Sequence, residues 1–128
     1  MSYTMDRTIT DAGFEEVDAR TRKALMDAGF GVLTEIDVKA TMKKKLDKDM
    51  TDYRILGACN PALAWEAIGH EPKLGTMLPC NVILRSTDAG VEISAVDPIA
   101  SMAAIDNEDL KKVVTRVREM LDKVVAAV

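Results

Sequence analysis

Cysteine, histidine and tryptophan are scarce in this chain. Its 128 residues include two cysteines, one histidine and one tryptophan. The two cysteines do not form a CxxC pair, which argues against a zinc ribbon and a thioredoxin-type site. Adding His70, Glu66 and Asp97 to Cys59 and Cys80 gives only a loosely spaced ligand set, although a dimer could double it across a two-fold axis. The sequence therefore names no metal and no cofactor.

Excess positive charge and long apolar runs are also missing. The net charge is -4 and the isoelectric point is about 5.0, so no basic surface for nucleic acid or an anionic membrane is expected. The longest uncharged apolar run, residues 77–84, is too short to span a bilayer. The N-terminal residues lack the apolar core of a signal peptide. We expect a cytoplasmic protein with reduced thiols and with neither nucleic-acid nor membrane partners.

What remains is an ordinary globular composition. Hydrophobic residues make up 48% of the chain and charged residues 30%. A chain of this length buries roughly two-thirds of its surface on folding, which is enough for a self-supporting core. There is no internal repeat, linker or low-complexity segment, so residues 1–128 are expected to form a single domain.

Alternating and helical patterns of apolar residues predict the order of secondary structure. Strands are expected at residues 2–9, 30–38, 53–58, 77–85 and 91–97, and helices at 12–28 (capped by Thr10 or Asp11), 40–46, 61–68 and from 106 or 107 almost to 128. Residues 70–72 are expected in a loop. This order indicates an α+β fold in which the long helices pack on one face of an antiparallel-rich sheet.

The least polar third of the chain, residues 53–85, contains both cysteines. Asn60 and Pro61 form a strong helix-start signal, because Asn is a good N-cap and Pro suits the first helical position. Gly69 is a plausible helix stop. Cys59 therefore directly precedes a helix N-terminus, where amide hydrogens and the helix dipole favour a thiolate. The alternative is a small buried residue at a strand-to-helix corner, since free cysteine is among the most buried residue types.

Cys80 lies in a predicted strand. It alternates in phase with Leu78, Val82 and Leu84, which indicates a thiol in the core. Pro79 cannot donate a ladder hydrogen bond, so this part of the strand is an edge, a bulge or the point where the strand begins. Such a kinked start beside a helix N-terminus could form a pocket.

Two charged groups are interpreted as solvated surfaces. Glu35 and Asp37 share one side of a strand about 7 Å apart, but a glycosidase-like pair would need a cleft that nothing here supplies. Residues 43–45 are three lysines, yet Asp47 and Asp49 follow closely and no aromatic residues are interleaved. Neither group is expected to carry a function.

Four segments together resemble the bacterial and archaeal family called domain of unknown function 302. They are residues 28–38 (AGFGVLTEIDV), 53–61 (YRILGACNP), 78–82 (LPCNV) and 96–98 (VDP). The resemblance covers almost the whole chain. It implies a TATA-binding-protein-like β-α-β(4)-α fold and a homodimer. DNA binding does not follow, because the similarity is one of topology and this chain is acidic.

Three functions remain open. The one we favour is a homodimeric small-molecule-binding module; the sequence does not decide whether it is an enzyme, and a binding role is favoured over catalysis. Its predicted ligand-binding residues are the motif positions Cys59, Asn60, Pro61, Pro79, Cys80 and Asn81. The second is a thiol-based redox or sulfur-handling protein with Cys59 as nucleophile and Cys80 as resolving thiol, although no motif places His70 as a base. The third is a purely structural dimerisation domain in which both cysteines fill the core.

Overall fold

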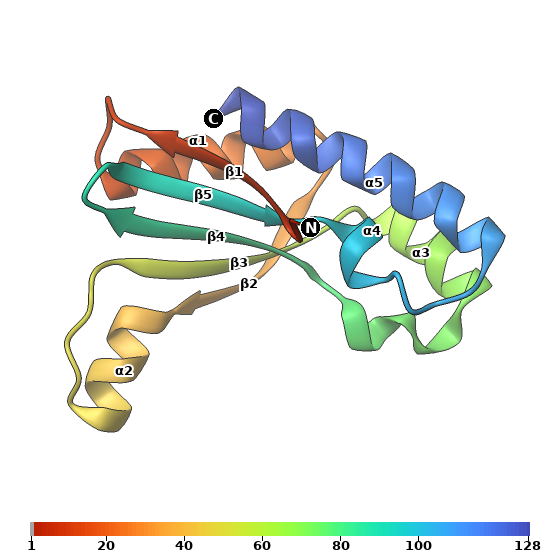
Figure 1. Ribbon diagram of the computed structural model, residues 1–128, viewed down its shortest axis with the longest axis horizontal. Helices are drawn as coiled ribbons and strands as arrows, with labels where there is room; N and C mark the ends of the chain where they lie inside the picture. Colours follow the sequence, from red (N-terminus) through yellow and green to blue (C-terminus); the bar gives the residue numbers. More distant parts are fainter. Residues whose placement is uncertain (1) are drawn as a thin grey trace.

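The computed structural model describes residues 2–128 and is built on one five-stranded antiparallel sheet (Figure 1). The strands are β1 (Thr4–Ile9), β2 (Gly31–Asp37), β3 (Tyr53–Cys59), β4 (Cys80–Thr87) and β5 (Gly90–Val96). Their order across the sheet is β1-β5-β4-β3-β2, and every neighbouring pair is antiparallel. The cysteine-bearing strand β4 is therefore central, whereas β1 and β2 form the edges.

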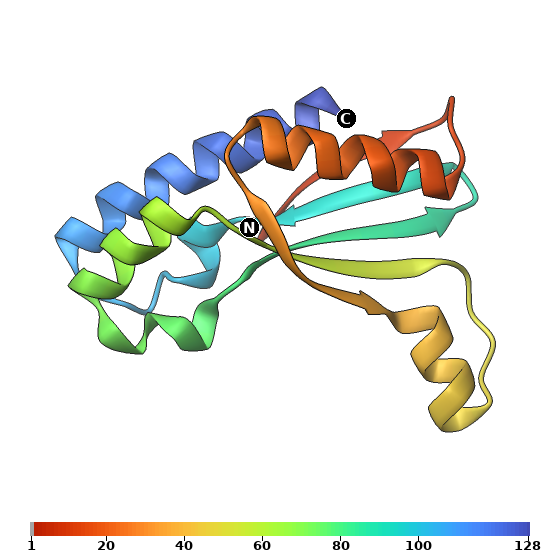
Figure 2. The ribbon, with the colours of Figure 1, turned by 180° about the vertical axis from the view of Figure 1, so that it is seen from behind.

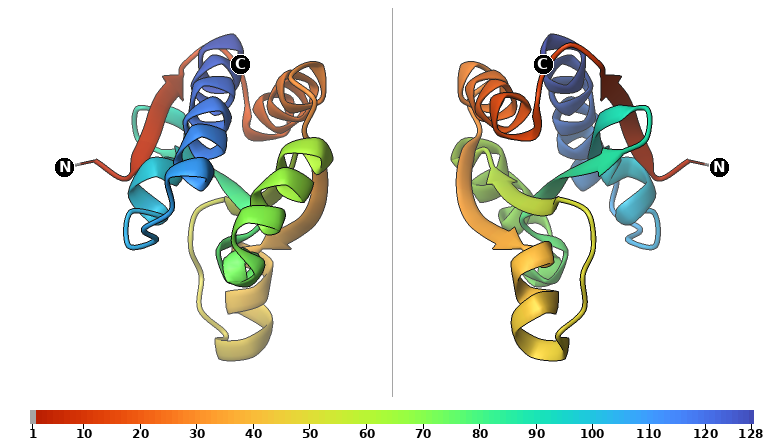
Figure 3. Two further views of the ribbon diagram at one scale, coloured as in Figure 1. Left: turned by 90° about the vertical axis from the view of Figure 1, so that its right-hand side faces the viewer. Right: turned by 90° about the vertical axis from the view of Figure 1, so that its left-hand side faces the viewer.

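Two long helices cover one face of this sheet. They are α1 (Phe14–Asp27) and α5 (Glu108–Ala127), which lie side by side over the strands (Figure 3). Shorter elements are α2 (Val38–Leu46), α3 (Pro61–His70), the 3₁₀ helix η1 (Pro72–Met77) and α4 (Pro98–Ser101). The predicted α+β class is confirmed, while the likeness to the TATA-binding-protein class stays a prediction. In residues 2–128, no helix combines the length and apolar character that a membrane crossing requires.

The buried side chains form two groups. The sheet core lies between the sheet and the helices α1 and α5, and its most buried members include Leu25, Leu56, Val82, Leu84, Ile93 and Leu121. The helical cluster lies beyond the end of the sheet and consists of Ala67, Leu74, Met102, Leu110, Val113 and Val114. Helix α5 contributes its C-terminal half to the sheet core and its N-terminal half to the helical cluster. It therefore joins the two groups.

Several predicted boundaries shift. Helix α3 continues through Gly69 to His70 instead of stopping at Gly69, and Glu71 is extended because it precedes Pro72. The stop signal was therefore the proline and not the glycine. Strand β4 starts at Cys80 instead of at residue 77, because residue 77 still belongs to η1. Helix α1 starts at Phe14, and its N-cap is Gly13 instead of Thr10 or Asp11.

Strict alternation along residues 30–38 predicts Val32 and Thr34 on the same face of the sheet, and a bulge in β2 overturns this prediction. The pairing with β3 shifts between Val32 and Thr34, so these two residues lie on opposite faces of the sheet. Val32 packs against the sheet core, whereas Thr34 pairs with Gly57 on the uncovered face. Strict alternation in the sequence could not show the extra residue.

The second face of the sheet carries no helix within residues 2–128, and one corner of the fold projects from it (Figure 2). Ile36, Ile55 and Ile83 are cross-strand neighbours on this open face. We call residues 31–46, which comprise β2 and α2, the β2–α2 arm. No residue of the arm is buried.

Candidate functional site

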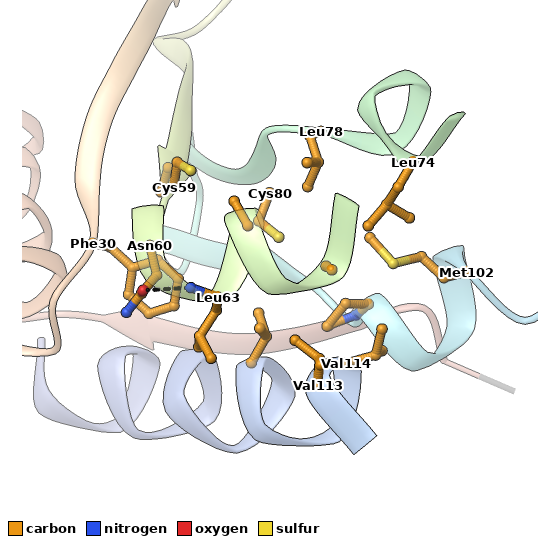
Figure 4. A pocket seen from close by; sticks show the side chains of 15 residues that line it. Phe30, Cys59, Asn60, Leu63, Leu74, Leu78, Cys80, Met102, Val113 and Val114 are labelled. Atoms are coloured by element: carbon orange, nitrogen blue, oxygen red, sulfur yellow. Dashed lines mark hydrogen bonds between the residues drawn. The ribbon is translucent and has the colours of Figure 1, made fainter. Parts of the chain in front are cut away.

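A small cavity lies between the sheet core and the helical cluster (Figure 4). Its volume is about 40 Å³. It is lined by Phe30, Ala58, Cys59, Asn60, Leu63, Ala64, Ala67, Leu74, Leu78, Cys80, Pro98, Met102, Val113, Val114 and Val117. Almost all of these side chains are apolar. The cavity therefore occupies the place where strand β3 passes into helix α3 and α3 faces α5.

The start of helix α3 forms as the sequence predicts. The Asn60 side chain accepts a hydrogen bond from the backbone N–H of Leu63 at 3.1 Å, and Pro61 is the first helical residue. Asn60 also lies against Gly29, whose φ of 88° belongs to the left-handed region. A Cβ at Gly29 would lie 3.2 Å from Asn60 Nδ2, so glycine leaves room for the capping side chain. This local structure fixes Cys59 at the corner before the helix.

Both cysteines line the cavity and neither forms a disulfide. Ala58 pairs directly with Cys80 in the sheet, so Cys59 is one residue from the position opposite Cys80. Standard strand spacings then place the two cysteine Cα atoms about 6 Å apart. Cys59 is half-buried, whereas Cys80 is buried.

Burial has a chemical consequence for Cys80. Desolvation, with a smaller contribution from the neighbouring Cys59, raises the pKa of the Cys80 thiol to about 11. Cys80 is therefore a neutral thiol near pH 7. It is a poor nucleophile in this state.

The other predicted ligand-binding residues lie outside the cavity wall. Pro61 is exposed at the start of α3, and Asn81 is exposed on the open face of the sheet, opposite Gly57. Pro79 packs toward the same glycine, since a Cβ at Gly57 would lie 2.6 Å from Pro79 Cγ. Pro79 and Asn81 border a second hollow, which also reaches Cys80. The structure thus brings Cys59, Asn60 and Cys80 together and places the other three elsewhere.

The proline also explains how β4 begins. Pro79 is the residue directly before the strand, and the Leu78–Pro79 peptide bond is cis. Of the three predicted alternatives for this position, the structure shows the start of a strand. The strand itself is central in the sheet, so it is not an edge.

Sequence reasoning missed most of the cavity wall. Val113 and Val114 were recognisable as members of an apolar helical stripe, but no sequence signal shows that this stripe faces Cys80. Met102 lies within residues 99–105, which show no clear hydrophobic period, and the sequence places Phe30 only in the predicted strand 30–38. The contacts between residues so far apart in sequence depend on how the helical cluster packs.

The two carboxylates of β2, Glu35 and Asp37, both have structural partners. Glu35 Oε2 lies 3.1 Å from Arg22 Nη2 of α1, and Asp37 caps α2 by accepting a hydrogen bond from Ala40 N at 2.9 Å. The interpretation of this pair as a simply solvated face was therefore incomplete. Residues 43–45, by contrast, are exposed as predicted.

The loosely spaced metal-ligand set does not assemble. Across residues 2–128, no three or more His, Cys, Asp or Glu side chains gather in a way that could hold a metal ion. His70 is exposed and is the last residue of α3, instead of lying in a loop. Glu66 pairs with Arg116 at 2.8 Å, and Asp97 pairs with Arg118 at 3.1 Å.

Comparisons with known proteins agree with the resemblance seen in the sequence. A family model described as "Domain of unknown function DUF302" matches residues 5–128. A similar solved structure is an uncharacterized conserved DUF302 protein from Bacillus stearothermophilus, with a TM-score of 0.92 and 21% sequence identity. The match covers 99% of this chain and 98% of that one, and at this identity it shows a shared fold. No curated protein matches the chain.

Proposed function

The chain belongs to the DUF302 family, to which no function is assigned, and we propose that it is a homodimeric, single-domain module that binds a small ligand. The observation that carries this proposal is the cavity between the sheet core and the helical cluster, with both thiols in its wall. An apolar cavity with a few convergent polar groups is the usual form of a ligand site. Both cysteines are free, which fits a reducing compartment such as the cytoplasm.

The size of the cavity limits what it can hold. Its volume of about 40 Å³ is far below the roughly 300–1,000 Å³ of sites for drug-sized ligands. A water molecule needs about 10–15 Å³ by this kind of measure, so the space corresponds to about three waters. Because the wall is apolar, water is a poor occupant. The ligand is thus a group of only a few atoms.

Native mass spectrometry of the protein as isolated tests the proposal. A reproducible mass excess over the bare chain is expected for the wild type. Ala67→Leu fills the cavity, since Ala67 is buried in its wall, and should remove the excess. Ala62→Leu is the matched control, because Ala62 is exposed on the same helix, and it should keep the excess. Circular dichroism confirms that both variants fold. Bare mass in all three proteins would contradict retention of a ligand.

The β2–α2 arm supports the homodimer. Leu33, Ile36 and Leu46 in the arm are 66%, 47% and 62% exposed, and β2 offers an open sheet edge. A nine-residue helix with no buried side chain gains little from tertiary packing, and helices this short are marginal alone. The arm is expected to be covered in the working protein.

Charge favours a second copy as the cover. The arm, residues 31–46, contains four lysines, one glutamate and one aspartate, so it carries a net charge of +2. The whole chain carries -4, which leaves -6 on the remainder. The arm of one protomer is therefore attracted to the acidic body of its partner, and a two-fold axis repeats this contact.

Light scattering coupled to size-exclusion chromatography tests this interface. The wild type should elute at twice the chain mass of 14.0 kDa. Ile36→Glu places a charge within the arm and should give the monomer mass. Ile99→Glu is the control, because Ile99 is 44% exposed but lies outside the arm. A monomeric wild type, or a dimer unchanged by Ile36→Glu, would count against the arm as the interface.

Thiol redox chemistry is the second candidate. The Cα separation of about 6 Å lies within the disulfide range of about 4.4–6.8 Å, but Ala58 is the residue paired with Cys80, so alternation turns the Cys59 side chain to the other face and the bond requires the β3–α3 corner to move. Oxidised glutathione would take two electrons and two protons from Cys59 and Cys80, forming the disulfide and two molecules of reduced glutathione. The test is the loss of two titratable thiols and of two hydrogen masses after this treatment. If both thiols remain reduced, this candidate is excluded. The alternative to ligand binding is then that the two cysteines only fill the core.

A further inference from the structure

We infer that helix α2 of the β2–α2 arm lies on the open face of the partner's sheet, where its lysines pair with Asp6. This inference rests on the proposed function, because it names the surface that the arm binds in the homodimer. Helix α2 and the two long helices α1 and α5 lie on opposite sides of the sheet (Figure 3). The arm and the open face are therefore on the same side of the molecule, and one contact between two copies covers both.

One row of side chains crosses the open face from edge to edge. The register places Ile36 opposite Ile55 and Ile55 opposite Ile83, so the row is apolar from the arm to the central strand β4. It continues through Ser94 to Asp6 on β1. The part of the face over β1, β5, β4 and β3 is hollowed to a volume of about 640 Å³, and we call it the sheet hollow. The open face thus offers a partner an apolar floor and an acidic end.

The charges of the sheet hollow suit a basic helix. Its charged residues are Asp6, Arg85 and Glu92. Arg85 Nε lies 2.8 Å from Glu92 Oε1, so these two charges neutralise one another. The Asp6 carboxylate accepts a hydrogen bond from Thr4 Oγ1 at 3.1 Å but, among residues 2–128, forms no salt bridge. Its negative charge is available to a cation on another chain.

The arm supplies such cations. Two of its four lysines, Lys39 and Lys43, pair with aspartates of the same chain. The other two, Lys44 and Lys45, are exposed and form no salt bridge in the part of the chain that the structure describes. They do not reach Asp6 of their own chain, because β1 and β2 are opposite edges of the sheet, four strand spacings or about 19 Å apart. A pair between these lysines and Asp6 therefore joins two protomers.

Two-fold symmetry allows this pairing in one arrangement of the faces. An axis that runs between the two open faces, parallel to the strands, brings the β2 edge of each copy over the β1 edge of the other. The arm lysines then meet Asp6 twice in the dimer. An axis between the faces but perpendicular to the strands brings β2 over β2, so that lysines oppose lysines. Like charges repel, and the first arrangement is favoured.

The dimensions of the two surfaces agree. Helix α2 has nine residues, so it is about 14 Å long and, with its side chains, about 10 Å wide. The five strands make the open face about 19 Å wide. The face therefore accommodates the partner's α2. Leu46, which ends this helix and is 62% exposed, leaves water when it packs over the apolar row beside Ile83.

Charge reversal tests the inference on the full chain. Asp6→Lys, and separately the double variant Lys44→Glu/Lys45→Glu, should each raise the dimer dissociation constant by about tenfold or more, because each reversal acts at both contacts. A chain with all three substitutions has both sides reversed, and its dissociation constant should return to within about threefold of the wild type, because residues in contact are not additive. Sedimentation equilibrium measures the constants, and circular dichroism confirms folding.

Asp122→Lys is the matched control. Asp122 is exposed on α5, on the side of the sheet away from the open face, and its reversal changes the net charge as much as Asp6→Lys does. The dissociation constant of this variant should equal that of the wild type. An effect as large as that of Asp6→Lys would mean that only net charge matters, which contradicts a contact at Asp6.

A carbodiimide cross-link reports the contact directly and needs no variant to fold. The reagent activates the Asp6 carboxylate, and a lysine Nζ within reach displaces it to form an amide. Unlabelled and ¹⁵N-labelled proteins are mixed and left to exchange subunits before the reaction. Mass spectrometry should then find peptides that join Asp6 of one isotope to Lys44 or Lys45 of the other. Asp6→Asn should lose this product.

Three results would overturn the inference in a dimeric wild type. They are a dissociation constant unchanged by Asp6→Lys, no recovery in the chain with all three substitutions, or no cross-link between Asp6 and the arm of another chain. If any of them occurs while Ile36→Glu still gives the monomer, the arm interface stands and only the surface named for its partner is wrong. A monomeric wild type would contradict both this inference and the proposed homodimer.

Discussion

Arg54 Nη1 on strand β3 lies 2.9 Å from Asp18 Oδ2 on helix α1. Arg22 Nε contacts the other oxygen of Asp18 at 2.6 Å, and Arg54 also pairs with Glu15 at 2.9 Å and with Glu35 at 3.5 Å. These five side chains tie α1 to the two strands at the arm side of the sheet. Asp18 is only 7% exposed, so its charge depends on both arginines.

Replacing Asp18 should make the stability of the protein depend differently on pH. Burial alone would raise the pKa of Asp18, but the hydrogen bonds and charges of Arg22 and Arg54 outweigh it, so the pKa lies below its ordinary value of 3.8. The contribution of Asp18 is therefore present above pH 3.8 and is lost as the pH falls through the lowered pKa. Asp18→Asn should cost about 3 kcal/mol of unfolding free energy at pH 7.

Urea unfolding at pH 7 and at several values below 3.8 measures this effect. The difference between wild type and Asp18→Asn should shrink as the pH falls. Asp27→Asn is the control on the same helix, because the Asp27–Lys23 pair is exposed and should contribute less than about 1 kcal/mol. A constant difference at every pH would show that Asp18 acts by packing and not by its charge.

Cys80 should resist alkylation in the folded protein. Its pKa of about 11 leaves little thiolate at pH 8, and its side chain is 6% exposed. In Cys59→Ser, iodoacetamide should modify Cys80 at least about 100-fold more slowly than in the same protein unfolded in urea. Mass spectrometry follows the reaction. In Cys80→Ser the remaining Cys59, which is partly exposed, should react faster, and equal rates would contradict the buried position of Cys80.

Two glycines should respond to alanine in opposite directions. A Cβ at Gly57 would collide with the Thr34 side chain and lie 2.6 Å from Pro79 Cγ, so Gly57→Ala should destabilise the protein by about 1–3 kcal/mol. Gly69 lies inside α3 with nothing within 4 Å of an added Cβ, so Gly69→Ala should stabilise it by about 0.5–1 kcal/mol. Thermal unfolding of both variants checks the signs. A stabilised Gly57→Ala would mean that Thr34 and Pro79 can move apart.

Loss of the α3 cap should weaken the start of that helix. Asn60→Ala removes the hydrogen bond to Leu63 N and should cost about 1 kcal/mol. Asn60→Asp keeps an acceptor at the helix N-terminus and should restore most of the loss. Chemical denaturation compares the two variants. Equal destabilisation by both would show that the contact with Gly29, and not the cap, holds the corner together.

Local signals account for what the sequence predicts well. Asn60-Pro61 identifies the start of α3 because capping depends on adjacent residues alone, and Asn107 likewise caps α5. The alternation around Cys80 also identifies a buried thiol, since the central strand is regular. The fold class follows from the order of these elements.

Long-range packing accounts for what the sequence predicts poorly. Asn81 shares a motif with Cys80, yet alternation along β4 turns it to the open face, away from the cavity. Val32 and Thr34 separate because of a bulge that leaves no mark in the hydrophobic pattern. Met102 reaches the cavity only because the helical cluster folds back on α5.

Because α5 belongs to both groups of buried residues, its backbone amides are expected to report two different opening events. Its N-terminal half packs in the smaller helical cluster, and its C-terminal half packs on the sheet core. Smaller clusters open more often by local unfolding. Hydrogen–deuterium exchange along this one helix should therefore be faster at Val113 and Val114 than at Leu121 and Val124. A single continuous helix would then exchange as two cooperative units.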